Sequence, residues 1–179
     1  MAKSNIPAEY LAALGGEDPL VIQKQAPLRL KKLLKGRSEK ELATRPGRGK
    51  WSVKEVIGHL ADHEVVYGCR LRFVAALDRP VLGGYDQDLF VTRLGIERAT
   101  TKELFQSYAS VRKANNELVG RLDAAAFDRI GLHAERGEES LRTIVTRNAG
   151  HDRLHEAQVE RTLAAVSAMR RKQAGSKRR

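Results

Sequence analysis

The sequence of 179 residues contains one cysteine, Cys69, so it cannot form an internal disulfide bond. Aromatic residues make up only 5% of the chain. No apolar run approaches the roughly 18 residues that span a bilayer. The first residues, MAKSNIPAEY, lack the apolar core of a signal peptide. These absences predict a soluble protein of a reducing compartment, the cytoplasm, with no membrane partner and one domain stabilised by its core.

Acidic residues are also in short supply. Asp and Glu number 22 against 33 Lys and Arg, which gives a net charge of +11. Six basic residues lie in the last ten positions, RRKQAGSKRR, and without them the chain has 27 basic and 22 acidic residues, a net charge of +5. We expect residues 169–179 to form a disordered basic tail that contacts phosphates non-specifically. The rest of the sequence has no nucleic-acid recognition motif, which argues against nucleic acid as the main partner.

The pattern of caps and apolar residues predicts four long helices. They are expected from Asp18 to about Lys35, from Ser52 to about Leu77, from Thr100 to Gly120 and from Ser140 to about Arg170. Pro27 should bend the first of them. No run alternates apolar and polar residues for long enough to predict a sheet. The predicted fold is therefore an all-α four-helix bundle over residues 18–168, preceded by an N-terminal extension over residues 1–17.

The histidines are the clearest candidates for chemistry. His151 and His155 are four residues apart, so their rings lie one turn apart on one side of the fourth helix. The second helix carries His59 and His63 at the same spacing, beside its apolar stripe. Three imidazoles can bind a divalent ion and leave a fourth position open, as in catalytic zinc sites. Spacing alone does not choose between His59 and His63, and surface histidines that pair with carboxylates are the alternative. His133, in a polar loop, is expected to be exposed.

Several segments together resemble one known family. The stretch WSVKEVIGHLADHE at residues 51–64, Arg70, the pair YD at residues 85–86 and AGHDRLHEAQVERT at residues 149–162 resemble the DinB-like superfamily. This superfamily includes YfiT-type metal-dependent hydrolases and bacillithiol and mycothiol S-transferases. The resemblance covers the chain from about residue 18 to residue 163. It implies a metal site between the second and fourth helices, with His59, His151 and His155 as the ligands. A homodimer is expected of a bundle of this sort.

A divalent ion on three neutral imidazoles lowers the pKa of a water or a thiol that it binds. Two enzyme activities are therefore expected, hydrolysis or S-transfer from a low-molecular-weight thiol cosubstrate, each acting on a small electrophilic substrate. The alternative is a stress-related metal-binding protein without turnover. Zinc, nickel, iron and cobalt all suit three imidazoles, so the sequence does not select the metal.

Three other polar residues are candidates for roles beside the ion. Asp152 shares a helix face with His155, and it is expected to act as a general base or hydrogen-bond acceptor, or else to form a salt bridge with a neighbouring basic residue. Gln158 is placed to hydrogen-bond a bound water or a substrate, although a glutamine there also serves as polar filling. Arg70 is expected to bind an anionic group of the substrate or thiol, with a buried ion pair to Asp86 as the alternative.

Overall fold

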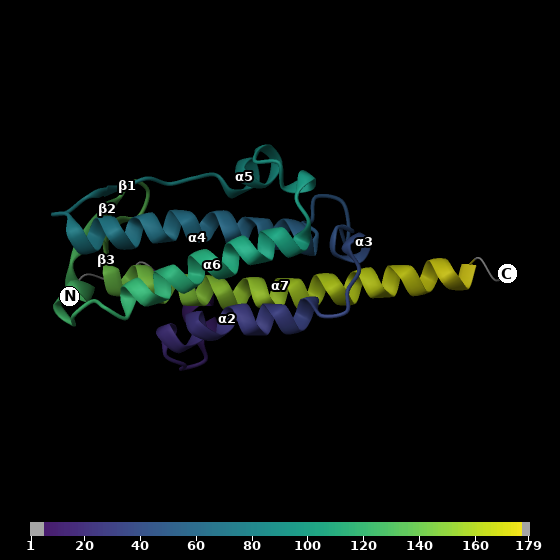
Figure 1. Ribbon diagram of the computed structural model, residues 1–179, viewed down its shortest axis with the longest axis horizontal. Coiled ribbons are helices and arrows are strands. Elements are labelled where there is room, and N and C mark those ends of the chain that lie inside the picture. Colours follow the sequence, from purple (N-terminus) through teal and green to yellow (C-terminus); the bar gives the residue numbers. More distant parts are fainter. Residues whose placement is uncertain (1–5, 177–179) are drawn as a thin grey trace.

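The computed structural model describes residues 6–176, and four long helices lying side by side make up most of it (Figure 1). They are α2 (Pro19–Leu34), α4 (Val53–Ala76), α6 (Thr101–Val119) and α7 (Leu141–Ser176). The shorter helical segments are α1 (Ala8–Leu14), α3 (Glu39–Leu42), α5 (Gln87–Arg93), η1 (Ile96–Arg98) and η2 (Ala125–Asp128). The expected all-α four-helix bundle is confirmed.

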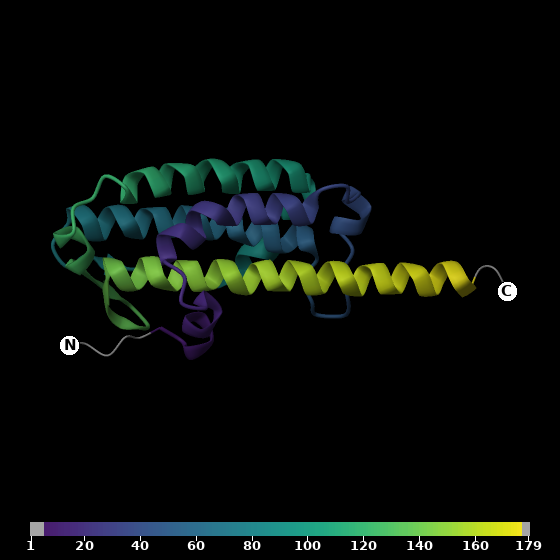
Figure 2. The same cartoon turned by 90° about the horizontal axis from the view of Figure 1, so that it is seen from below.

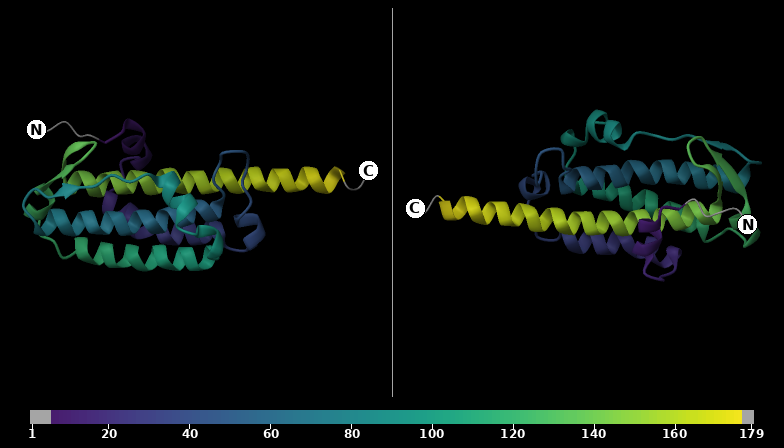
Figure 3. Two further views of the ribbon diagram at one scale, coloured as in Figure 1. Left: turned by 90° about the horizontal axis from the view of Figure 1, so that it is seen from above. Right: turned by 180° about the vertical axis from the view of Figure 1, so that it is seen from behind.

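The order of the helices in space depends on one long connection. Helices α4 and α6 run in the same direction, so the chain between them, residues 77–100, returns along the length of the bundle (Figure 1). Helices α2 and α7 run in the opposite direction to this pair (Figure 3). Helix α7 contacts both α2 and α4. The antiparallel pair α4 and α7 therefore places the first half of α4 beside the middle of α7.

Side-chain caps fix where the long helices begin. The Ser52 hydroxyl accepts a hydrogen bond from the backbone N–H of Glu55, whose carboxylate accepts one from the backbone N–H of Ser52 in return. Thr100 and Glu103 form the same reciprocal box at the start of α6. Asp18 caps α2 just before its proline. Each such cap contributes about 1 kcal/mol, and these starts agree with the sequence prediction to within one residue.

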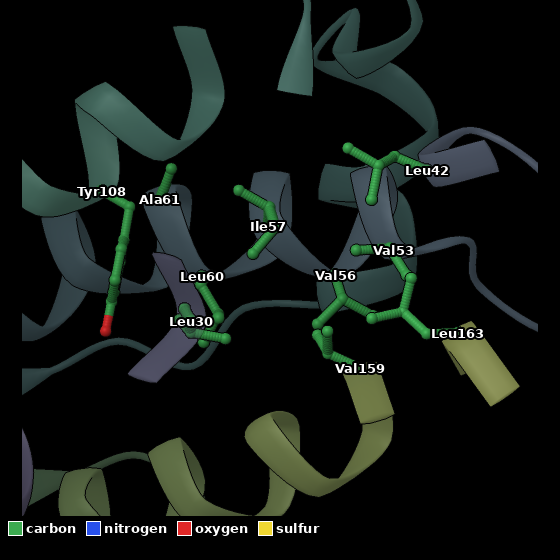
Figure 4. Close-up of a cluster of buried hydrophobic side chains, with 10 residues drawn as sticks. All are labelled: Leu30, Leu42, Val53, Val56, Ile57, Leu60, Ala61, Tyr108, Val159 and Leu163. Carbon is green, nitrogen blue, oxygen red and sulfur yellow. The ribbon is translucent and has the colours of Figure 1, made fainter. Parts of the chain in front are cut away.

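The apolar positions predicted for α4 and α7 are all buried: Val53, Val56, Leu60, Tyr67, Leu71, Val74, Leu141, Ile144, Val145, Val159, Leu163 and Val166. Figure 4 shows one of the resulting clusters, to which α2, α3, α4, α6 and α7 all contribute side chains. Helical spacing in the sequence predicts that Leu20 shares the buried face of α2 with Leu30 and Leu34, and this prediction is wrong, since the Leu20 side chain is 40% exposed. The buried face of α2 is instead centred on Ile22, Ala26 and Leu30.

A small three-stranded sheet at one end of the bundle is a feature that the sequence did not predict. Strand β2 (Ile130–His133) pairs in parallel with β1 (Val81–Leu82) and antiparallel with β3 (Gly137–Ser140). A strand of four residues places only two side chains on each face, which is too few to show an alternating pattern. The expectation that His133 is exposed is wrong, because the sheet buries it to 2% exposure.

Helix α7 is longer than expected. It continues to Ser176 instead of ending near Arg170, and its last turns extend past the other helices (Figure 2). Residues 169–176 of the expected disordered tail are thus helical, whereas residues 177–179 lie outside the described part of the chain. Within the expected N-terminal extension, residues 8–14 form α1. None of the helices over residues 6–176 combines the length and the apolar character that crossing a membrane requires.

Candidate metal centre

Helices α4 and α7 bring three imidazole rings together inside the bundle. His59 comes from α4, and His151 and His155 lie one turn apart on α7. The Nε2 atom of His151 is 3.1 Å from Nε2 of His59 and 3.0 Å from Nε2 of His155. One ring nitrogen from each residue lies within 4.8 Å of the other two. These are the three histidines that the family resemblance implied.

The contacts between these nitrogens fit a shared cation better than mutual hydrogen bonds. A neutral imidazole nitrogen carries either one proton or one lone pair, so Nε2 of His151 can form a hydrogen bond with only one of its two neighbours. Nitrogens that bind one tetrahedral zinc ion at about 2.0–2.1 Å lie about 3.3 Å apart, which is close to the observed separations. The donor set and its spacing therefore fit a divalent transition metal.

Burial keeps the three imidazoles neutral, which is the protonation state that a metal ligand needs. Desolvation lowers the pKa of His59 to about 2 and the pKa of His155 to about 4. Desolvation also lowers the pKa of His151 well below its ordinary value, and the neighbouring imidazoles lower it further. At neutral pH, each ring therefore has a lone pair available for a cation.

Gln158 orients one of these rings. Its amide oxygen accepts a hydrogen bond of 2.8 Å from Nδ1 of His155, which leaves the lone pair of that ring on Nε2, facing the other two histidines. The Nδ1 atoms of His59 and His151 are buried and have no hydrogen-bond partner among the described residues. The ring of Trp51 covers His59, with 5.1 Å between the two ring centroids. Gln158 thus contacts a candidate ligand, a position that differs both from the predicted contact with water or substrate and from polar filling.

His63, the alternative third ligand, is engaged elsewhere. Its ring stacks on His151, with 4.0 Å between the centroids. Its Nε2 is 2.9 Å from the amide oxygen of Asn148, and its Nδ1 is 2.7 Å from the hydroxyl of Tyr85. Because an amide oxygen only accepts, Nε2 donates the proton and Nδ1 accepts one from Tyr85. Both ring nitrogens are therefore used, and this distinguishes His63 from His59.

Asp152 forms a buried ion pair with a side chain of another helix. The Arg112 guanidinium of α6 donates hydrogen bonds of 2.6 and 2.8 Å to its two oxygens, and it donates one of 2.7 Å to Glu64. Asn115 donates to the second oxygen of Glu64 at 2.9 Å. Burial raises the pKa of Asp152 to about 6, although Arg112 opposes this shift. This geometry favours the salt-bridge alternative for Asp152, with a partner from another helix.

A cavity of about 180 Å³ lies next to the histidines, on the side of the small sheet. His63 and His151 form one part of its wall. Another part is formed by three cationic side chains from α4, α7 and the β2–β3 turn and by two glutamates: Arg70, Arg147, Arg136, Glu135 and Glu139. Glu139 is buried and pairs with both Arg136 and Arg147. The cavity therefore presents excess positive charge beside the candidate metal centre.

Arg70 is the cationic residue of the cavity that the sequence singled out. Its Nη2 donates a hydrogen bond of 2.6 Å to the backbone oxygen of Gly83, and its Nε is buried without a partner in the part of the chain that the structure describes. The ion pair with Asp86 that we considered is not formed, because Asp86 instead accepts hydrogen bonds from two backbone N–H groups of α5. Arg70 thus retains a donor for a ligand.

Sequence reasoning missed several residues of this wall. Asn148 lies one turn before His151 on the same side of α7, so the helical period was a usable signal for it. Tyr85 entered only through the family resemblance. Tyr10, which lines the cavity from α1, gave no signal, because no local pattern reports a contact between residues about 140 positions apart.

The fold and the site together define a four-helix-bundle protein with a candidate three-histidine metal centre beside a basic cavity. The chain belongs to the DinB superfamily, whose family model matches residues 24–159.

Two known proteins show how this chain compares with others. A protein of Oceanobacillus iheyensis named "Putative metal-dependent hydrolase OB0413" is 23% identical over 139 residues, which cover 76% of this chain and 78% of the relative. The solved structure of YfiT from Bacillus subtilis, described as a probable metal-dependent hydrolase with an unusual four-helix bundle topology, matches with a TM-score of 0.72 at 18% identity. The match covers 87% of this chain and 86% of YfiT. At this identity the structural match establishes the shared fold.

Proposed function

We propose that this chain is a metal-dependent hydrolase of small electrophilic substrates, in which His59, His151 and His155 hold one divalent transition-metal ion. The convergence of three neutral imidazole nitrogens carries the proposal. The descriptions of the Oceanobacillus relative and of YfiT as metal-dependent hydrolases support it. When bound, such an ion lowers the pKa of a coordinated water, so that a nucleophile is available near neutral pH.

The residues of the cavity would bind and orient the substrate. Arg70 has an unused buried donor and would bind a carboxylate or another anionic group. His63 holds the Tyr85 hydroxyl at the cavity wall, where burial raises the pKa of Tyr85 to about 12 and keeps the phenol protonated. The cavity volume of about 180 Å³ is below the range of about 300–1,000 Å³ of ligand pockets, so the cavity suits a compact substrate or one small group of a larger substrate.

Thiol S-transfer is a second candidate activity for the same site. The cationic side chains in the cavity wall suit the carboxylates of a low-molecular-weight thiol as well as those of a substrate. A purely structural metal site is less well supported. Among the described residues no carboxylate joins the three histidines to close the coordination sphere, so a position remains open for a reactant.

Metal content is the first test. Protein purified without a histidine tag should contain about one transition metal per chain by elemental mass spectrometry. His59→Gln and His155→Ala should lose this metal, whereas His63→Gln, the matched control, should retain it because His63 is hydrogen-bonded to Tyr85 and Asn148. A wild-type protein that contains no metal and gains no thermal stability from added zinc, nickel or manganese would overturn the proposal.

Turnover is the second test, and it separates the two activities. We would follow p-nitrophenyl acetate hydrolysis by the metal-loaded wild type and by His155→Ala, each with and without added cysteine. Hydrolysis without thiol, lost in the variant, supports a hydrolase. A reaction that requires cysteine and yields acetylated cysteine together with p-nitrophenolate supports S-transfer. A metal-loaded protein that does neither, and also does not conjugate cysteine to 1-chloro-2,4-dinitrobenzene, would favour the non-catalytic alternative.

The proposed location and assembly rest on the sequence. The single cysteine supports our proposal of a cytoplasmic protein. We also propose a homodimer, which light scattering on the eluate of a size-exclusion column would test against the chain mass of 19.9 kDa.

A further inference from the structure

One wall of the cavity comes from a helix that lies outside the family match. Tyr10 of α1 lines the cavity, and its ring centroid is 6.4 Å from that of His151. The matched residues begin at position 24, so the family match does not include α1. The remaining walls are formed by α4, α7, the small sheet and the connection from β1 into α5.

Helix α1 is held against α7 by a close backbone approach. Figures 2 and 3 show it lying beside α7. A Cβ atom at Gly150 would lie 2.7 Å from both Cβ and the backbone oxygen of Tyr10, so only glycine permits this approach. Leu14 at the end of α1 packs with Ile22 and Ala149. The position of the Tyr10 ring is therefore fixed by the residue immediately before His151.

An ion pair and a tight turn complete the attachment. Glu17 pairs with Arg153 of α7. Gly15 and Gly16 both have positive φ, at 58° and 81°, and they let the chain turn sharply from α1 into α2. The seven residues of α1 thus have anchors at Tyr10, at Leu14 and just beyond their end, so the ring stays in place without a long helix to support it.

We propose that Tyr10 is a specificity-determining residue, which limits the size of the carboxylate-bearing compounds that bind in the basic cavity beside His151. Arg70, whose buried Nε has no partner among the described residues, attracts the carboxylate, and the Tyr10 ring occupies the space into which a larger substituent would extend. A tyrosine ring is stiff and has two side-chain torsions, so it excludes volume at little cost in conformational entropy. This inference rests on the proposed function only in treating the cavity as the substrate site.

Two substitutions alter this wall by different routes. Tyr10→Ala removes the ring, and Gly150→Ala forces the α1 backbone away from α7 while favouring the helical state of α7 itself. Tyr10→Phe is the matched control, since it keeps the ring and removes only the hydroxyl. Calorimetry on the zinc-saturated full chain would measure the dissociation constants of acetate and phenylacetate. Because both probes carry the same carboxylate, any direct contact with zinc cancels in their ratio.

We expect the wild type and Tyr10→Phe to bind acetate at least tenfold more tightly than phenylacetate. In Tyr10→Ala and Gly150→Ala this preference should fall below threefold, mainly through tighter binding of phenylacetate. A wild type without size preference, or without carboxylate binding, would overturn the inference, and so would variants that keep the wild-type ratio. If the chain binds no zinc, the proposed function fails, and the same ratio measured on the metal-free protein still decides whether Tyr10 sets the size limit.

Discussion

Arg112 carries a positive charge at 1% exposure, between two carboxylates that are also buried, Glu64 and Asp152. Its guanidinium additionally lies 5.2 Å from the ring centroid of Tyr108. Moving such charges out of water is costly, and their mutual attraction offsets this cost only while every partner is present. The group joins α4, α6 and α7 next to the histidine cluster, so the packing of the three helices there depends on it.

Loss of Arg112 should therefore be strongly destabilising. We expect Arg112→Met to lower the free energy of unfolding by about 3–5 kcal/mol, because it leaves Glu64 and Asp152 buried without a counter-charge. The next residue, Lys113, provides the control: its ion pair with Glu117 is solvent-exposed, so Lys113→Met should change stability by less than about 1 kcal/mol. Urea unfolding at pH 7 measures both, and equal effects would contradict the assigned role of the buried ion pairs.

The buried histidines should make the metal-free protein sensitive to acid. Burial lowers the pKa of His59 to about 2, of His63 to about 3 and of His155 to about 4, so in the folded chain they stay neutral where the unfolded chain binds protons. Their contribution to stability is present above pH 6.5 and is lost progressively as the pH falls toward these values. Asp152, with a pKa raised to about 6, acts in the opposite sense between about pH 6 and 4.

The pKa values of His133 and His151 are also lowered, and those of Asp62 and Glu156 are also raised. Since five histidines oppose three carboxyl groups, the net effect should be destabilisation by acid. We expect the free energy of unfolding of the metal-free protein to fall by more than about 2 kcal/mol between pH 7 and pH 5. Urea titrations at a series of pH values would measure it. A stability that is constant over this range would mean that the histidines are protonated in the folded state.

At the level of elements, the contact between α4 and α6 depends on a glycine. A Cβ atom at Gly68 of α4 would lie 2.5 Å from the side-chain oxygen of Asn115 on α6. That asparagine donates hydrogen bonds to the backbone oxygen and to the carboxylate of Glu64, at 3.0 and 2.9 Å. A side chain at position 68 would therefore push apart the two helices or displace the asparagine from Glu64.

We predict that Gly68→Ala destabilises the protein by about 1–3 kcal/mol, as overpacking does elsewhere. This loss should appear even though alanine favours a helix over glycine by about 0.5–1 kcal/mol. Ser107→Ala, at an exposed position of α6, is the control and should stay within about 0.5 kcal/mol of the wild type. Thermal unfolding of the wild type and of the two variants would measure these changes in stability. A Gly68→Ala variant that is more stable than the wild type would mean that Asn115 moves aside at no cost.

Long helices that begin with a capping residue could be predicted from the sequence, and short elements could not. Helices α4 and α7 each contain several turns of apolar side chains, so their buried faces followed from the sequence. The strands β1–β3 are two to four residues long, and α1 is seven, so neither shows a period. The choice of His59 over His63 also exceeded what helical phase can give, because it depends on the partners Tyr85 and Asn148 from distant segments.

At the level of the whole molecule, more than half of the excess positive charge lies in the last ten residues of the sequence. Six of the 33 basic residues lie in positions 170–179. Within this segment, Arg170 contacts Glu41 of α3 at 3.2 Å, and both Arg171 and Lys172 are exposed. Arg170 follows His155 by roughly four turns of α7, so the end of this helix is removed from the histidine cluster.

Deletion of residues 170–179 should therefore separate two properties of the molecule. Non-specific binding to duplex DNA, measured by fluorescence anisotropy at low salt, should weaken at least tenfold because the net charge falls from +11 to +5. Metal content per chain should be unchanged. Full-strength DNA binding by the shortened chain would place the contact surface on the bundle instead.

The contact between His59 and His151 joins positions 92 residues apart, with α6 and the long return connection between them. The entropy of closing such a loop is lost before its contacts stabilise the chain, so the three rings should meet late in folding. In the transition state for folding the three rings are then not yet together, so a metal ion has little to bind. The bound cation would therefore slow the unfolding of the native protein and prolong its lifetime, while it leaves the rate of refolding almost unchanged.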